Sequence, residues 1–187
     1  MKAGVIVIFS VLLSMASSPI LADAYVGLGI GSASYDVDLS GIGGGDFEDN
    51  GTGTKIYGGY AFNDYFAAEA TYYNFAEASV GAVESSPGSG VFNSAKADMT
   101  GVGAYAVGMY PVSKEVNLML KLGVLNWDAD LKVNNTSGSN DGTDVAYAVA
   151  ASYAFTKELL VTAEWEAFNT DNPEVSMLSL GFKFIFR

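Results

Sequence analysis

After the first two dozen residues, apolar and polar positions along the chain alternate with a period of two. Every second residue of 159–167 is apolar, whereas Glu164 and Glu166 fall on the opposite face. Every second residue of 178–186 is also apolar, and Lys183 falls on the opposite face. A strand separates such sets cleanly onto two faces, whereas a helix would scatter them around its circumference. The pattern therefore predicts β-strands.

The same alternation predicts eight strands, at about 24–35, 54–62, 65–77, 96–110, 115–127, 143–155, 158–168 and 175–187. Three of the joins between them are tight turns with turn-forming residues, at 62–64, 111–114 and 155–157. Four joins are longer and rich in Gly, Ser, Asn and Asp, at 36–53, 78–95, 128–142 and 169–174. No Pro-rich linker or shift in composition marks a second domain, so we expect one all-β domain over residues 25–187.

Eight antiparallel strands of this length fit a closed up-and-down β-barrel, of which two kinds exist. A soluble lipocalin-like barrel turns its apolar face inward, and a membrane barrel turns it outward. The strict alternation of short turns with long loops favours a bacterial outer-membrane barrel, because its two rims face different compartments. The glycine-rich polar face fits a narrow interior. Aromatic residues also cluster near strand ends, as interfacial girdles require: Tyr57, Tyr60, Phe62, Tyr65, Phe66, Tyr72, Tyr110, Tyr153 and Phe155.

The first 24 residues have the three-part pattern of a secretory signal peptide. Lys2 gives a positive start, residues 3–13 form an apolar run, and Ala22-Asp23-Ala24 is a small-x-small cleavage site. The apolar run is shorter than the roughly 20 residues that a transmembrane helix needs. We therefore expect export, with cleavage after Ala24, rather than a membrane anchor.

The composition excludes several classes of chemistry. The 187-residue chain contains no cysteine and no histidine, so it has no disulfides, no Ser-His-Asp triad and no histidine-ligated zinc site. Enzymes that are small outer-membrane barrels share the expected architecture, but their mechanisms rely on histidine. We therefore expect neither an enzyme nor a cofactor or metal site. A formal net charge of −12 argues against nucleic acid as a partner.

The first long join is strongly acidic. Its segment Asp46–Gly51 begins like a calcium-binding EF-hand loop, but the twelfth position is Tyr57 and not the bidentate glutamate that such a loop requires. A solvated acidic loop is the simpler interpretation. Divalent ions could also bridge it loosely to anionic lipopolysaccharide without a defined site.

Four segments, in order along the chain, resemble the OmpA-like transmembrane domain family. Tyr57–Tyr65 is similar to that family's second strand and first turn, and Met109–Ser113 with Leu120–Gly123 to its second turn and fifth strand. Tyr153–Glu158 is similar to its third turn, and Met177–Gly181 to its last strand. The resemblance implies an eight-stranded outer-membrane barrel with periplasmic termini and four loops outside the cell. It also implies outer-membrane lipid, lipopolysaccharide and the barrel assembly machinery as partners.

The end of the chain departs from the family pattern. The family's assembly signal usually ends on an aromatic residue, here Phe186, but Arg187 follows it. We also expect no C-terminal peptidoglycan-binding domain, and therefore no tethering of the envelope.

Charged residues on the polar face are predicted to lie inside the barrel, where buried charges must be paired. The candidates are Glu69, Lys121, Glu164, Glu166 and Lys183. By resemblance to the OmpA-like family, the first three of these belong to an internal charged network linked to gating. The basic residue that the family carries on its fourth strand is replaced here by Val107. We further expect Lys183 to pair with Glu164 or Glu166, because their strands are neighbours.

Three functions fit these observations. The first is a structural outer-membrane barrel whose loops mediate surface interaction or adhesion. The second is a narrow, low-conductance ion channel along the inner charges, and the third is a soluble lipocalin-like carrier of an apolar ligand. A filled interior is usual for barrels of eight strands, which favours the structural function.

Overall fold

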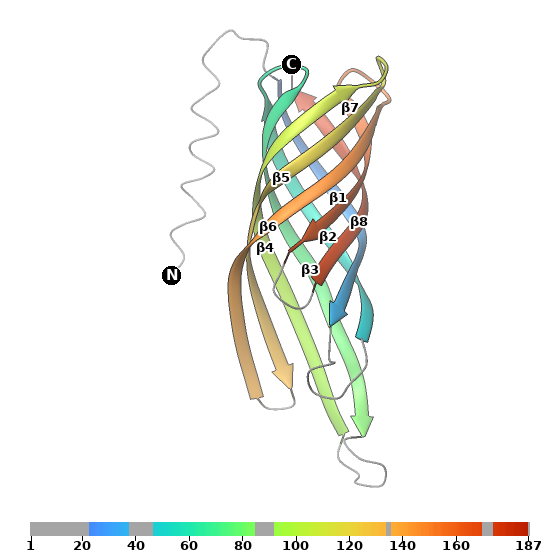
Figure 1. The fold of residues 1–187 in the computed structure, drawn as a ribbon. Coiled ribbons are helices and arrows are strands. Elements are labelled where there is room, and N and C mark those ends of the chain that lie inside the picture. The colour runs from blue at the N-terminus through green and yellow to red at the C-terminus, as the bar shows by residue number, and fades with distance from the viewer. Residues whose placement is uncertain (1–22, 38–46, 85–91, 134–135, 170–173, 187) are drawn as a thin grey trace.

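The computed structural model describes residues 23–37, 47–84, 92–133, 136–169 and 174–186. These residues form eight antiparallel strands that pair in chain order and close into one barrel through pairing of the last strand with the first (Figure 1). The strands are β1 (Asp23–Val37), β2 (Phe47–Ala61), β3 (Phe66–Glu84), β4 (Phe92–Pro111), β5 (Val116–Val133), β6 (Thr136–Ala154), β7 (Leu159–Phe168) and β8 (Glu174–Phe186). The predicted closed barrel is confirmed. Within these ranges no helix is long and apolar enough to cross a membrane.

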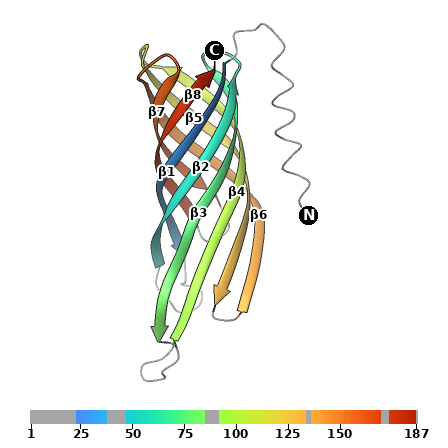
Figure 2. The ribbon, with the colours of Figure 1, turned by 180° about the vertical axis from the view of Figure 1, so that it is seen from behind.

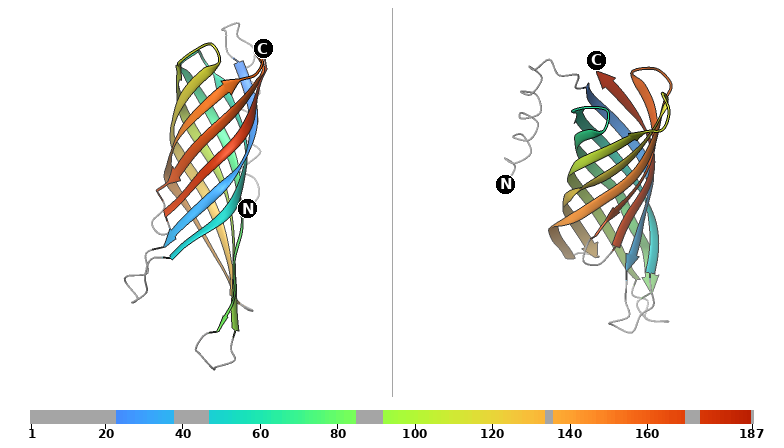
Figure 3. Two further views of the ribbon diagram at one scale, coloured as in Figure 1. Left: turned by 90° about the vertical axis from the view of Figure 1, so that its right-hand side faces the viewer. Right: turned by 45° about the horizontal axis from the view of Figure 1, so that its top comes forward.

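The barrel has two different ends, visible from both sides in Figures 1 and 2. We call the end with the three tight turns the turn end; β1 begins there and β8 finishes there. We call the opposite end the loop end. The hairpins β3–β4 and β5–β6 reach furthest at the loop end and extend beyond β7 (Figure 3).

The three tight turns share one hydrogen-bonding arrangement. In each turn a short polar side chain accepts hydrogen bonds from the backbone N–H groups two and three residues later. These side chains are Asn63, Ser113 and Thr156. Such side-chain acceptors stabilise a turn by satisfying backbone donors that no strand pairs. The predicted turn positions are therefore confirmed, with a local chemical reason.

The strands extend further at the loop end than the sequence pattern predicted. Most of the expected long join 128–142 is a paired hairpin, since β5 runs to Val133 and β6 starts at Thr136. The hydrogen bonds of a β-ladder come from the backbone. A strand can therefore continue outside the lipid with polar side chains on both faces. Similarly, residues 48–51 of the calcium-like segment lie in β2 and pair with β1, which contradicts the alternative of an EF-hand loop.

The outer surface of the barrel is apolar, and this finding excludes the lipocalin-like alternative. Large exposed apolar side chains cover every strand, among them Leu28, Ile56, Leu120 and Leu180. A soluble barrel would point this face inward. The exposed aromatic residues Phe62, Tyr65, Phe66, Tyr110, Tyr153, Phe155, Phe184 and Phe186 gather at the turn end. Tyr72, Tyr147 and Trp165 lie on the outer face further toward the loop end.

Tyr57 is an exception to the predicted aromatic girdle. Its ring points into the barrel and is almost completely buried. In the ladder between β1 and β2, Tyr57 pairs with Gly27 and Tyr25 pairs with Gly59. A Cβ atom at either glycine would overlap the tyrosine ring opposite it. The two glycines therefore leave the space in which the two rings lie inside a narrow barrel.

The predicted signal peptide, residues 1–24, falls outside the described residues except for Asp23 and Ala24. Those two residues begin β1 and pair with Ala61 and Tyr60 of β2.

Candidate functional site in the barrel interior

The barrel interior holds six buried charged side chains in the described part of the chain. All five predicted residues are among them: Glu69 on β3, Lys121 on β5, Glu164 and Glu166 on β7, and Lys183 on β8. The sixth is Lys55 on β2. Three ammonium groups and three carboxylates thus share one interior, and they balance in formal charge.

Lys55 was missed in the sequence for a specific reason. Assigning Tyr57 to the outer aromatic girdle also places Lys55 outside, because alternate residues of a strand share a face. The signal that could have found Lys55 is the glycine pattern of β2, where Gly53 and Gly59 have the same parity and face the crowded interior.

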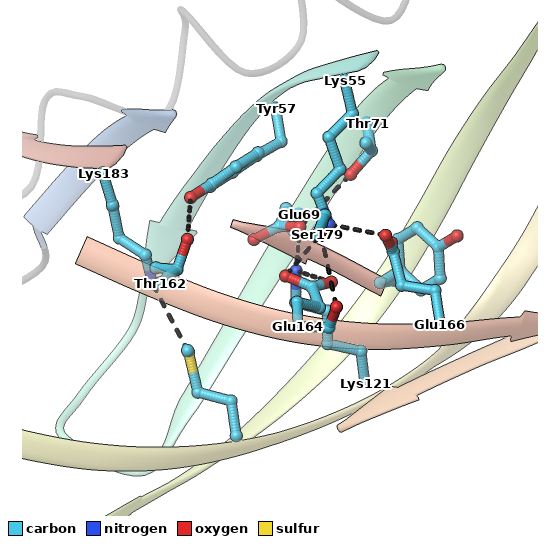
Figure 4. Close-up of polar contacts among 12 residues, drawn as sticks. Lys55, Tyr57, Glu69, Thr71, Lys121, Thr162, Glu164, Glu166, Ser179 and Lys183 are labelled. Atoms are coloured by element: carbon cyan, nitrogen blue, oxygen red, sulfur yellow. Dashed lines mark hydrogen bonds and ion pairs between the residues drawn. The ribbon is translucent and has the colours of Figure 1, made fainter. Parts of the chain in front are cut away.

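Lys55 links the two glutamates of β7. Its Nζ atom donates a hydrogen bond to Glu166 Oε2 at 2.6 Å and lies 3.2 Å from Glu164 Oε2. β2 and β7 are not neighbours in the sheet, so this ion pair crosses the lumen (Figure 4).

Lys121 makes the second link across the lumen. Its Nζ atom donates to Glu69 Oε1 at 2.7 Å and lies 2.7 Å from Glu164 Oε1. Glu164 Oε1 accepts no hydrogen bond from the described residues, so its contact with Lys121 is a charge contact without hydrogen-bond geometry. The ion pairs join Glu69, Lys121, Glu164, Lys55 and Glu166 into a single chain, which we call the charged network.

Hydroxyl groups donate further hydrogen bonds to the carboxylates of Glu69 and Glu166. Tyr25 donates to Glu69 Oε2 at 3.0 Å, and Thr71 donates to Glu69 Oε1 at 3.2 Å. Tyr73 donates to Glu166 Oε1 at 2.6 Å, and its hydroxyl also lies 2.8 Å from that of Tyr105. Such hydrogen bonds offset part of the desolvation cost of the two buried carboxylates.

The fourth strand contributes no charge to the network. Val107 is buried beside Lys121 in the β4–β5 ladder, and Tyr105 lies one inward position further along. The positive charge between Glu164 and Glu166 comes instead from Lys55, on the second strand.

The expected pair between Lys183 and a glutamate of β7 is wrong. Lys183 does point inward, but it lies opposite Leu160, whereas Glu164 lies opposite Ser179. Four residues along a strand separate those levels by roughly 13 Å. Lys183 Nζ instead contacts Met119 Sδ at 3.4 Å and lies 4.7 Å from the centre of the Tyr25 ring.

Bulky apolar side chains fill the interior on the loop side of the network. Tyr73, Phe75 and Phe168 are 0%, 1% and 2% exposed, and their ring centres lie 5.3 to 5.8 Å apart. Leu125 and Met177 are buried with them. We call these five residues the aromatic plug. Such packing leaves no continuous water path through the described interior toward the loop end.

The interior on the turn side of the network is hollow. A cavity of about 330 Å³ lies there, with Tyr25, Met119, Leu160 and Lys183 in its lining. We call it the turn-end cavity. Among the described residues, no cluster of histidine, cysteine and acidic side chains is arranged to hold a metal ion.

The chain was compared with models of protein families. Residues 5–186 match the model of the outer membrane protein beta-barrel domain. Outer membrane protein A of Escherichia coli O157:H7 is 28% identical over 152 residues, which are 76% of this chain and 41% of that protein. The chain therefore spans about two fifths of that relative's length.

Solved structures show the same fold. Ail of Yersinia pestis, in complex with the heparin analogue sucrose octasulfate, has a TM-score of 0.64 at 19% identity and covers 88% of this chain and 99% of its own. Neisserial surface protein A has a TM-score of 0.66 at 18% identity, covering 87% and 97%. OprG of Pseudomonas aeruginosa has a TM-score of 0.61 at 14% identity, covering 87% and 96%.

Proposed function

The chain belongs to the outer membrane protein β-barrel domain family, and from this premise we propose that it is a structural outer-membrane barrel whose loop end presents a surface for contact with other molecules. It is an outer-membrane protein and not an enzyme. The observation that carries the structural role is the filled interior on the loop side. A barrel that conducts ions needs a continuous polar path, whereas here the aromatic plug covers the charged network.

The network itself supports a structural role. Its ammonium and carboxylate groups lie within 2.6 to 3.2 Å of one another, and all are buried. Because the links join β2 to β7 and β3 or β7 to β5, they cross-brace strands that share no ladder. These links fix how strands on opposite sides of the barrel are positioned relative to one another along the barrel axis.

The loop end supports the contact role. Residues 139–144 of β6 pair with β5, whereas the ladder with β7 begins at Ala146. The described part of this hairpin therefore has an unpaired edge, on which Asn140, Asp141 and Thr143 are exposed. Its acidic character, with Asp128 exposed on β5, makes a sulfated ligand such as the one bound to Ail a poor partner. Lipopolysaccharide bridged by divalent ions, or a neutral or basic cell-surface ligand, fits better.

We propose that the loop end lies outside the cell and the turn end in the periplasm. The resemblance to the OmpA-like family supports the orientation, and a cleaved signal peptide and assembly by the barrel assembly machinery complete the proposal. A protein exported in this way resists SDS in the outer-membrane fraction until it is heated, because a closed barrel has no free edge within lipid. Unboiled and boiled samples should therefore migrate differently.

Bilayer conductance distinguishes the structural role from the ion channel. We expect purified, SDS-resistant barrels to give no steady current, and Glu69→Gln or Lys121→Met to give none either. A regular low conductance in the unmodified barrel that either substitution changes would favour the channel and contradict the proposal. SDS resistance of each variant shows that it is still folded.

A further inference from the structure

Lys183 differs from the other two buried lysines in having no carboxylate partner within the described residues. Lys55 and Lys121 each contact two glutamates. The contacts of Lys183 are the Met119 sulfur, a weak acceptor, and the face of the Tyr25 ring. The close-up shows Lys183 apart from the cluster around Glu164 and Glu166 (Figure 4).

This ammonium group is also deeply buried, since Lys183 is 6% exposed. A buried charge without an opposite charge is strongly unfavourable, because the lost hydration is not replaced. The three glutamates of the interior make their ion pairs with Lys55 and Lys121, and none of them lies within ion-pair distance of Lys183. The Tyr25 hydroxyl is committed to Glu69.

Lys183 lines the turn-end cavity, whose volume is about 330 Å³. This volume corresponds to roughly ten water molecules at about 30 Å³ each, so it can hold a small organic ion. Apolar side chains form much of the lining: Ala61, Met109, Pro111, Met119, Leu160 and Ile185. Asp23 and Asp64 lie at its outer part together with Lys114.

We propose that the turn-end cavity binds a small monocarboxylate, with its carboxylate against Lys183 and its aliphatic part against Met109, Met119 and Leu160. One buried ammonium group without a direct ion pair favours a ligand with a single negative charge. The apolar lining favours a ligand with a hydrocarbon tail over chloride. Entry is from the turn end, because the charged network and the aromatic plug close the other side.

The methionines provide a direct test. Met109 and Met119 line the cavity, whereas Met99 and Met177 lie on the loop side of the network. We would label the methionine methyl groups of the folded chain with ¹³C in lipid nanodiscs and titrate hexanoate, with the uncharged hexanamide as the matched control. Substitution of each methionine by leucine assigns its signal.

We expect hexanoate to shift the Met109 and Met119 signals and to leave those of Met99 and Met177 unchanged. Hexanamide should bind at least tenfold more weakly. The variant Lys183→Met should bind both ligands equally, while Lys114→Gln at the outer part should keep the preference for hexanoate. Chemical shifts of Met99 and Met177 report whether each variant is still folded.

Three results would overturn the proposal. They are no shift at Met109 and Met119 with hexanoate, equal affinity of the unmodified barrel for the two ligands, and a preference for hexanoate that survives in Lys183→Met. The second result would show that the cavity binds hydrocarbon without selecting for the carboxylate. The third would show that a group other than Lys183 recognises the carboxylate.

Discussion

Buried lysines occur both in the charged network and on the turn side of the barrel interior, but their partners differ. In the charged network, lysines and glutamates form ion pairs across the lumen, and the aromatic plug covers them on the loop side. On the turn side, Lys183 is equally buried but faces a cavity and has no carboxylate partner among the described residues. The difference teaches that burial and residue type do not set the role of a charge. The partners within reach decide whether it braces the fold or is available to a ligand.

The largest expected effect is the loss of the central ammonium group on the matched side. Lys55→Met leaves Glu164 with one cation and Glu166 with none, and removing one partner of a buried pair costs about 4 kcal/mol of the free energy of unfolding. Urea unfolding in lipid vesicles, followed by tryptophan fluorescence, measures the loss. Lys114→Met, at an exposed turn position, is the control. If both variants unfold alike, the network does not brace the barrel.

The aromatic plug should contribute slightly less. Phe168→Ala removes a ring that packs edge-on against both Tyr73 and Phe75, and large-to-small changes at such sites destabilise by about 3 kcal/mol. The same urea experiment applies. Phe184→Ala, on the outer face, is the matched control because lipid can fill the space that its ring leaves. An equal loss in the two variants would show that the plug is not tightly packed.

Tyr25 lies at the boundary between the two halves and makes a smaller, separable contribution. Tyr25→Phe removes the hydrogen bond to Glu69 but keeps the ring that faces Lys183. A hydrogen bond to a charged group stabilises by about 2 kcal/mol, and we expect that loss in the free energy of unfolding. Tyr110→Phe, on the lipid-facing surface, should change little. Loss of hexanoate binding in Tyr25→Phe would contradict this separation of roles.

The smallest effect, and the sharpest contrast with Lys55→Met, is expected for Lys183→Met. This substitution removes a buried charge that has no direct ion pair among the described residues, so the free energy of unfolding should stay the same or rise. Urea unfolding of the two lysine variants side by side measures the contrast. A destabilisation of Lys183→Met as large as that of Lys55→Met would show that the two halves do not differ.

Much of the fold follows from local patterns in the sequence. The period of two predicts the strands, and the polar residues Asn63, Ser113 and Thr156 mark the three turns where they cap the backbone. The extra length of β5 and β6 was not predictable from alternation, because strands surrounded by water do not need an apolar face.

The interior was predicted only in part, because its contacts join strands that are not neighbours. Parity along each strand places Glu69, Lys121, Glu164, Glu166 and Lys183 inside. Parity does not give the level of each side chain along the barrel axis. It also does not reveal contacts across the lumen, such as the hydrogen bond between Lys55 and Glu166, which are 111 positions apart. Neighbouring strands suggested a partner for Lys183, but the register of β7 and β8 places that partner too far along the barrel.

The central claim is that the interior is closed toward the loop end and open toward the turn end. Because the chain has no cysteine, single cysteines can report this directly. Met119 and Leu125 both point inward from β5, on opposite sides of the network. In detergent-solubilised barrels, a water-soluble thiol reagent should modify Met119→Cys rapidly and Leu125→Cys only after heat denaturation. Equal modification of both cysteines in the folded barrel would contradict the account.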